Sequence, residues 1–207
     1  TIEGDGNIDL LDRFSINADL ILTLNNDAGG VTTTNILLKK NLTLEGSADL
    51  DVSGAIKNSG GNRSFINNSD GTVTVENITL SQNNTSYTLT MSGDSDTLVS
   101  GIISNGSTST AGKLIKAGTG ALTLSGANTY DGTTTINAGK VIARNDTALG
   151  DTSGNTTIGA SGTLELQNDI TIGSGETLTN SGDLLNAQDD NTYAGVISGS
   201  GTTTVTG

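Results

Sequence analysis

Short apolar–polar alternations separated by glycines run through residues 113–150 and restrict this stretch to β-structure. In the run Leu122-Thr123-Leu124, the two leucines face one side of an extended chain and the threonine faces the other, as in a half-buried strand. Glycine between such runs permits positive φ and therefore a sharp turn. Because no room remains for a helix between the runs, the segment predicts a coil of β-strands.

Two sequence echoes indicate that this coil repeats. The pentapeptide Asn-Thr-Tyr-Asp-Gly at 128–132 returns as Asn-Thr-Tyr-Ala-Gly at 191–195. Similar runs begin near Gly54, Gly101 and Gly195, and these glycines are separated by 47 and then 94 residues. Two coils of about 23 residues would account for the shorter separation, which is within the range of solenoid repeats. At about 20–25 residues per coil, the chain would form about nine coils and a rod about 40–45 Å long.

The composition suits a thin core better than a globular one. Hydrophobic residues make up 32% of the chain and aromatic residues only 2%, which is enough for stacked coils that use small aliphatic side chains. A disordered Thr-, Asn- and Gly-rich stalk is an alternative, although a disordered chain has no reason to keep an ordered alternation. Proline is absent, as expected for strands that need every backbone N–H for pairing. We predict an all-β chain without helix, in one domain over residues 1–207.

The run at 118–132, followed by Thr133–Ile136, Gly139 and a closing Ala148-Leu149-Gly150, resembles the passenger-associated transport repeat. This repeat belongs to autotransporter passenger domains of Gram-negative bacteria. The resemblance is best over residues 113–150, with a partial second copy at 191–207. It implies a single right-handed parallel β-helix, or β-solenoid, on the bacterial cell surface or secreted. The candidate motif residues are Gly118, Gly120, Leu122, Leu124, Gly126, Asn128, Tyr130, Gly132, Ile136, Gly139, Asn191, Tyr193 and Gly195.

Catalytic chemistry has few candidates in this sequence. Histidine and cysteine are absent, which excludes a Ser-His-Asp triad and imidazole or thiolate metal sites. Asp49 and Asp51 share one strand face about 7 Å apart, within the range of inverting glycosidases. The histidine and the nearby basic residues of polysaccharide-cleaving β-helix enzymes have no counterpart, so solvated surface positions are the preferred interpretation. Asp189-Asp190 is interpreted as a turn. We predict no enzyme activity and no cofactor.

Three other features have a structural interpretation. Asp5, Asn7 and Asp9 follow the spacing of a calcium loop but lack its turn glycine and its final glutamate, so a turn before a strand is preferred. Tyr130 and Tyr193 occupy equivalent repeat positions, which favours packing at a corner over ligand stacking. Their neighbours Asn128 and Asn191 are expected to support the turn through positive φ and bonds to their own backbone.

Charge and hydropathy limit the partners. The net charge of −13 disfavours nucleic acid and an anionic bilayer. No run of 18 apolar residues exists, so no membrane span is predicted in this segment. The chain opens on Thr-Ile-Glu, so any signal peptide is expected to be removed or to lie outside the segment. The expected partners are further β-coils of the same protein or of another copy, and a host-cell or surface ligand.

Three functions remain open at this point. The first is a non-enzymatic structural or adhesive segment of an autotransporter-like surface protein. The second is the subunit of a filament or sheath built by end-to-end stacking of β-helices. The third, least favoured, is a polysaccharide-cleaving enzyme. The expected stacking end is the uncharged, proline-free β-segment Thr202, Thr203, Thr204 and Val205, because unpaired strand edges template further strands unless they are capped.

Overall fold

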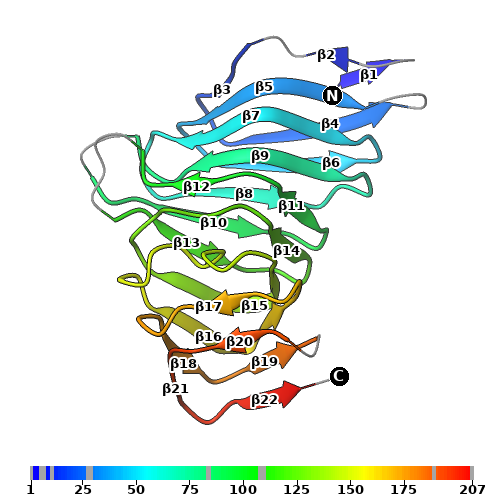
Figure 1. Ribbon diagram of the computed structural model, residues 1–207. Coiled ribbons are helices and arrows are strands. Elements are labelled where there is room, and N and C mark those ends of the chain that lie inside the picture. The colour runs from blue at the N-terminus through cyan, green and yellow to red at the C-terminus, as the bar shows by residue number, and fades with distance from the viewer. Residues whose placement is uncertain are drawn as a thin grey trace.

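The computed structural model describes residues 2–4, 8–9, 12–26, 30–82, 85–106, 111–187 and 190–205. These residues form 22 strands and no helix, and every strand pair among them is parallel. The chain winds as a β-solenoid of about eight turns, close to the nine expected. Figure 1 shows the turns stacked from the N-terminal strands at one end to β22 at the other. The predicted all-β fold is confirmed.

The strands lie in three parallel stacks, named here the first, second and third stack. The first stack consists of β1 (Ile2–Gly4), β4 (Leu20–Asn26), β6 (Leu42–Gly46), β8 (Arg63–Asn67), β10 (Thr88–Ser92), β13 (Lys113–Lys116), the beginnings of β15 (Thr134–Ala143) and β16 (Thr156–Leu166), β18 (Thr177–Asn180) and β21 (Val196–Ser198).

The second stack continues around each turn. It consists of β2 (Ile8–Asp9), the beginnings of β5 (Val31–Leu38), β7 (Leu50–Asn58) and β9 (Val73–Thr79), β11 (Thr97–Val99), β14 (Ala121–Leu124), the ends of β15 and β16, β19 (Asp183–Asn186) and β22 (Thr202–Val205). The third stack consists of β3 (Phe14–Ile16), the ends of β5, β7 and β9, β12 (Ile103–Ser104), and the separate pair β17 (Thr171–Ile172) and β20 (Thr192–Tyr193).

The register gives the length of each turn. Paired residues lie between 19 positions apart, as for Thr177 and Val196, and 26 positions apart, as for Arg63 and Leu89. Gly54 and Gly101 lie two turns apart, as the 47-residue spacing predicted. The extension of that spacing to Gly195 is wrong, because Gly195 lies over Glu176, at the corner between the third and first stacks.

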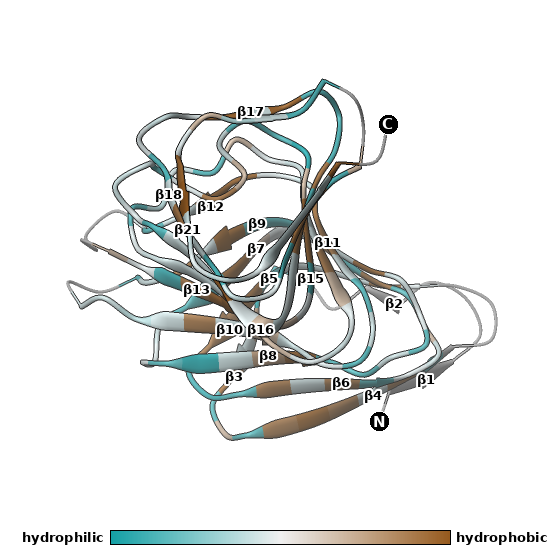
Figure 2. Ribbon diagram, turned by 90° about the horizontal axis from the view of Figure 1, so that it is seen from below, coloured by the Kyte–Doolittle hydropathy of each residue, from teal (hydrophilic) through white to brown (hydrophobic). Residues whose placement is uncertain are grey.

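The core is a narrow column of side chains enclosed by the three stacks. Alternation along each strand points every second residue inward, as in β13, where Leu114 and Lys116 are buried. Register then places equivalent inward residues above one another, for example Phe65, Met91 and Lys116 along the first stack. Figure 2, viewed from below, shows the hydrophobic strand segments arranged around this axis. Stacking therefore buries a continuous core that no single coil could form.

Asparagine side chains join successive turns at the corner between the second and third stacks. Asn77 Nδ2 donates to the Gly54 carbonyl at 3.3 Å, and Asn77 Oδ1 accepts from Ile102 N at 2.9 Å. Asn35 makes the corresponding pair of bonds two turns earlier. These bends interrupt the ladder, so the side-chain amide supplies the donor and acceptor that the backbone lacks there.

Between β12 and β17, the described part of the third stack has no strand. In these two turns the chain follows irregular paths at 125–133 and 144–155. Backbone bonds still join the turns, with Thr129 N donating to Ile103 O at 2.9 Å and Asp151 N donating to Tyr130 O at 2.7 Å. The candidate motif residues Asn128 and Tyr130 lie in this irregular region.

Within the described residues, no helix is long and apolar enough to cross a membrane.

Candidate functional site

Asn128 and Tyr130 link three successive turns from the interior of the third stack. Asn128 Oδ1 accepts a bond from Ile103 N at 2.8 Å, and its Nδ2 donates to Ala148 O at 2.6 Å. The Tyr130 hydroxyl lies 2.6 Å from Thr134 Oγ1. Asn128 therefore bonds the turns before and after its own, and not its own backbone as expected. Among described residues other than glycine, positive φ occurs at Asn168 and Asp169 instead.

Tyr130 is completely buried inside the fold. Burial raises the pKa of its phenol well above the usual range, and the charge of Glu176 adds to this, although the bond with Thr134 opposes it. Thr134 Oγ1 in turn donates to Leu149 O at 3.1 Å. The hydroxyl thus forms part of a bonded chain between two turns, consistent with the expected packing role.

The remaining motif residues of 118–139 shape the turns and fill the core. Leu122, Leu124 and Ile136 are buried inward positions. Gly118 has a φ of +70°, which side chains with a Cβ rarely adopt. A Cβ at Gly126 would overlap the Gly101 carbonyl oxygen of the preceding turn, so close stacking requires glycine there. A Cβ at Gly120, Gly132 or Gly139 would also lie too close to a carbonyl oxygen of the preceding turn, at 2.2, 2.2 and 2.4 Å.

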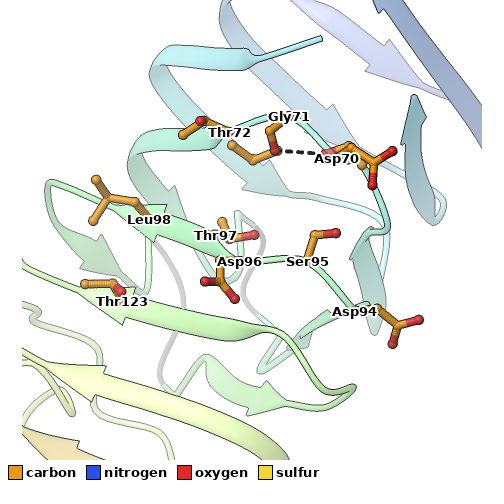
Figure 3. A pocket seen from close by; sticks show the side chains of 11 residues that line it. Asp70, Gly71, Thr72, Asp94, Ser95, Asp96, Thr97, Leu98 and Thr123 are labelled. Carbon is orange, nitrogen blue, oxygen red and sulfur yellow. Dashed lines mark hydrogen bonds between the residues drawn. The ribbon is translucent and has the colours of Figure 1, made fainter. Parts of the chain in front are cut away.

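A groove of about 560 Å³ lies on the corner between the first and second stacks (Figure 3). It is lined by residues 69–73, residues 94–98 and Thr123. Three carboxylates, Asp70, Asp94 and Asp96, contribute to it, while Leu98 and Thr123 form the part over β11 and β14. Among described residues, no group of three or more His, Cys, Asp or Glu side chains is arranged to hold a metal ion.

Several corner carboxylates bind the backbone of the next turn. Asp96 Oδ1 accepts from Ala121 N at 2.7 Å. Asp49 Oδ1, one of the two carboxylates considered for glycoside cleavage, accepts from Thr72 N at 2.6 Å, while Asp51 is exposed. Each bond satisfies a backbone N–H at the corner where a strand begins. These aspartates therefore have a structural role. Asp190 is exposed, whereas Asp5, Asn7 and Asp189 lie outside the described residues.

One family of known proteins is similar to the segment that holds Asn128 and Tyr130. Residues 114–143 match the family model of the passenger-associated transport repeat. Over this stretch the chain is similar to that repeat. This repeat and the β-solenoid together fit an autotransporter passenger domain, a class that is surface-exposed or secreted. No curated protein and no solved structure matches the chain.

At 191–195, where the sequence predicts a partial second copy of the repeat, the asparagine makes one of the two bonds between turns that Asn128 makes. Asn191 Oδ1 accepts from Ile170 N at 2.9 Å, just as Asn128 accepts from Ile103 N. Tyr193 is half-buried, and its hydroxyl has no hydrogen-bond partner among the described residues. Burial raises the pKa of this phenol above the usual range, and the charge of Glu176 adds to the increase.

The expected stacking end lies in the outermost described turn. Among its residues, Val196, Ile197 and Val205 are 64%, 42% and 68% exposed. In the preceding turns the residues paired with Ile197 and Val205 are the buried Leu178 and the half-buried Asn186. Thr202, Thr203 and Thr204 pair with β19 on one edge. This turn therefore presents apolar side chains on β21 and β22.

The structure shows four ionisable residues in positions that the sequence analysis missed. Lys116 is buried in the core column, and its Nζ donates to Ala117 O at 2.6 Å and Gly118 O at 2.9 Å. Lys140 Nζ donates to Glu165 Oε2 at 2.6 Å. Burial alone would raise the pKa of Glu165, but bonds from Lys140 and Gln167 lower it overall. Lys116 could have been found, because it occupies an inward position of the Leu114–Lys116 alternation.

We expect Lys116 to make stability depend on pH in the alkaline range. Burial lowers the pKa of its amine from 10.5 to about 8, although the charge of Asp96 opposes this. Between these values the unfolded chain binds the proton that the folded chain has released, so stability rises with pH over this window. Lys116→Met should remove that rise in chemical denaturation from pH 7.5 to 10.5, and exposed Lys113→Met should retain it. An equal rise in the wild type and Lys116→Met would contradict the assignment.

Glu176 is the fourth such residue, and it occupies a place where neighbouring turns have glycine. Gly154 and Gly195 lie at the same corner in the turns before and after it. Its carboxyl is buried, and Oε1 has no hydrogen-bond partner among the described residues. Burial raises the pKa of this carboxyl, Thr156 acts in the opposite direction, and the charge of Asp151 raises it further.

Replacing Glu176 by glutamine should stabilise the protein at neutral pH. Because the folded pKa is raised above 4.5, the folded chain binds more protons than the unfolded chain above that pH, and stability falls as pH rises. Glu176→Gln removes this loss, so its melting temperature should exceed that of the wild type at pH 7. The difference should shrink toward pH 4.5. Exposed Glu76→Gln is the control, and a gain of the same size and pH dependence in it would overturn the prediction.

Proposed function

We propose that this chain is a non-enzymatic, rod-forming segment of an autotransporter-like passenger domain, with a structural role in presenting an adhesive site. The observation that supports it most is the continuous β-solenoid around a transport repeat at 114–143. The motif residues of that repeat bond one turn to the next, as Asn128 does between Ile103 and Ala148. A scaffold of this kind holds its length and shape without a cofactor.

The contacts of the candidate catalytic carboxylates support a structural role. Asp49 and Asp96 accept backbone bonds, and Asp94 Oδ1 accepts from the Thr119 hydroxyl at 3.0 Å. The sequence has no histidine to act as a general base. The groove beside Asp94 and Asp96 offers carboxylate and hydroxyl oxygens, which suits a surface ligand that donates hydrogen bonds.

A second function is supported by the outermost described turn. Its exposed Val196, Ile197 and Val205, and its strands β21 and β22, would pair with a further β-coil of the same protein or another copy. Head-to-tail pairing of copies does not close, so it produces a filament.

Electron microscopy of the purified chain separates the two functions. The passenger-segment proposal predicts isolated short rods about 40 Å long, since each turn adds about 4.8 Å. Long fibres would favour the filament, and compact particles without a long axis would overturn both. Binding of the purified chain to host-cell surfaces then tests the adhesive role. The expected result is saturable binding that Asp94→Asn/Asp96→Asn weakens, and the absence of binding would restrict the chain to a scaffold.

A further inference from the structure

Five of the nine basic residues of this acidic chain gather at one corner of the solenoid, between the third and first stacks. Lys39 and Lys40 connect β5 to β6, and Lys57 lies near the end of β7. Arg63 and Lys113 are the first residues of β8 and β13. All five are exposed or half-buried. We name them the basic ridge, because they follow one another along the axis of the rod.

The register brings the ridge residues close together. Lys57 pairs with Leu37, which lies two residues before Lys39, so the Cα atoms of the two lysines lie about 8 Å apart. Arg63 belongs to β8, which pairs with β10, and β10 pairs with β13. Lys113 therefore lies two turns, or about 10 Å, beyond Arg63 along the rod. The ridge as a whole extends over about 14 Å.

Arg63 is held in place by backbone carbonyls. Its Nε donates to Lys39 O at 2.8 Å, its Nη1 donates to Asn62 O at 2.8 Å, and its Nη2 donates to Gly60 O. A Cβ at Gly60 would lie 2.5 Å from Lys39 Cα, so glycine allows the close approach of the two turns. These bonds fix the guanidinium and leave two of its five N–H groups to donate to a ligand.

Three of the four basic residues outside the ridge are engaged within the fold. Lys116 is buried, Lys140 forms an ion pair with Glu165, and Arg144 Nε donates to Gln167 Oε1 at 2.8 Å. The pair of Lys140 and Glu165 is the one ion pair among the described residues. No ridge cation therefore has a carboxylate partner in that part of the chain, and the ridge charge is available to an external anion.

Two aspartates border the ridge, and both bond within the fold. Asp19 Oδ1, one turn before Lys40, accepts from Asn41 N at 3.0 Å. Asp131 Oδ1, in the turn after β13, accepts from Asn105 Nδ2 at 2.5 Å. These carboxylates limit the length of the ridge, which is one corner wide. A slender anion that follows the rod axis fits this shape better than a flat anionic bilayer.

Uncharged polar residues separate the cations of the ridge. The connections at 80–87 and 105–112 occupy the same corner and contain no charged residue in the sequence. Thr85 and Ser86 are exposed there. Hydroxyl groups both donate and accept hydrogen bonds, which suits the hydroxyl groups of a sugar.

The ridge is separate from the acidic groove that contains Asp94 and Asp96 (Figure 3). The strands of the first stack begin at the ridge corner and end at the groove corner, and a five-residue strand such as β8 spans about 16 Å. Exposed charges separated by more than about 8 Å are largely screened at physiological ionic strength. The ridge is therefore locally positive although the chain has a net charge of −13.

We propose that the basic ridge binds an acidic polysaccharide, a chain of sugars that carries repeated sulfate or carboxylate groups. The polysaccharide lies along the rod axis. Its anionic groups contact the ridge lysines and the two remaining N–H groups of Arg63, and its hydroxyl groups contact Thr85 and Ser86. The acidic groove of a second copy is a poorer partner, because Asp49 and Asp96 already accept backbone bonds. This inference concerns a second surface and goes beyond the proposed function.

Calorimetric titration of the full chain with heparin, a sulfated polysaccharide, tests the proposal, and neutral dextran is the control ligand. The ridge variant is Lys39→Gln/Lys40→Gln/Lys57→Gln, which removes three cations and leaves Arg63 with its carbonyl bonds. Wild type should bind heparin and not dextran, and about 1 M salt should abolish the binding. The ridge variant should raise the Kd about tenfold or more.

The charge-matched variant is Arg13→Gln/Lys140→Gln/Arg144→Gln, which removes three cations outside the ridge and should change the Kd less than about twofold. Circular dichroism checks that both variants fold. A second measurement needs no variant, because bound heparin should protect Lys39 and Lys40 of the wild type from chemical acetylation.

Equal weakening by the two triple variants, or no binding of heparin by the wild type, overturns the proposal. So does equally tight, ridge-dependent binding to phosphatidylserine vesicles, since the partner would then be a bilayer. Ridge-dependent self-association in sedimentation overturns it as well, because the partner would be a second copy. Asp94→Asn/Asp96→Asn should retain heparin binding, so a failure of the ridge is distinguishable from a failure of the groove in the proposed function.

Discussion

Leu124→Asp is expected to unfold the chain or to reduce its stability by several kcal/mol, the cost of burying an unpaired charge. Leu124 is completely buried, and its pairing partners Val99 and Ala143 lie above and below it in the core. No cation lies among these neighbours. The measurement is chemical denaturation followed by far-ultraviolet circular dichroism, and loss of the cooperative transition is an acceptable form of the expected result.

Thr123→Asp is the matched control, because Thr123 precedes Leu124 on the same strand and faces the groove. Its new carboxylate would remain hydrated, and repulsion from the groove aspartates should cost below about 1 kcal/mol. Equal losses of stability in the two variants would show that the two faces of β14 have been assigned wrongly.

Asn128→Ala is expected to cost about 2–4 kcal/mol, because it leaves two buried backbone groups without partners. The groups are Ile103 N and Ala148 O, which belong to different turns. Hydrogen exchange should therefore increase in both neighbouring turns and not only at residue 128. Asn137→Ala removes an exposed asparagine and should change the free energy of unfolding by less than about 0.5 kcal/mol. A similar small change in Asn128→Ala would contradict the role of its amide as a link between turns.

The alternation and the glycines were sufficient to predict the fold class. When every second residue of a strand is β-branched or leucine, these residues share one face of the strand and are buried together. Leu122 and Leu124 are buried as expected. Gly54 and Gly101 gave the turn length because glycine is required where backbones of adjacent turns approach closely. Gly195 satisfies the same requirement at a different corner, so spacing alone assigned it to the wrong column.

The interior polar contacts were less predictable. The sequence pattern identified Asn128 and Tyr130 but suggested local turn bonds, whereas their actual partners lie one turn before and one turn after. Those partners depend on a register that varies from 19 to 26 residues, which no local pattern specifies. Glu176 was missed for the same reason, because its burial becomes visible only when it is aligned with Gly154 and Gly195.

Nuclear magnetic resonance of the labelled chain tests the stacked parallel register most directly. Backbone contacts between neighbouring strands should join Leu122 to Val141 and Val141 to Leu164, with the strands of each pair running in the same direction. The same pattern should continue from Leu164 to Leu184. Contacts in which the residue number rises on one strand as it falls on its neighbour would show antiparallel hairpins, and that result would contradict the solenoid.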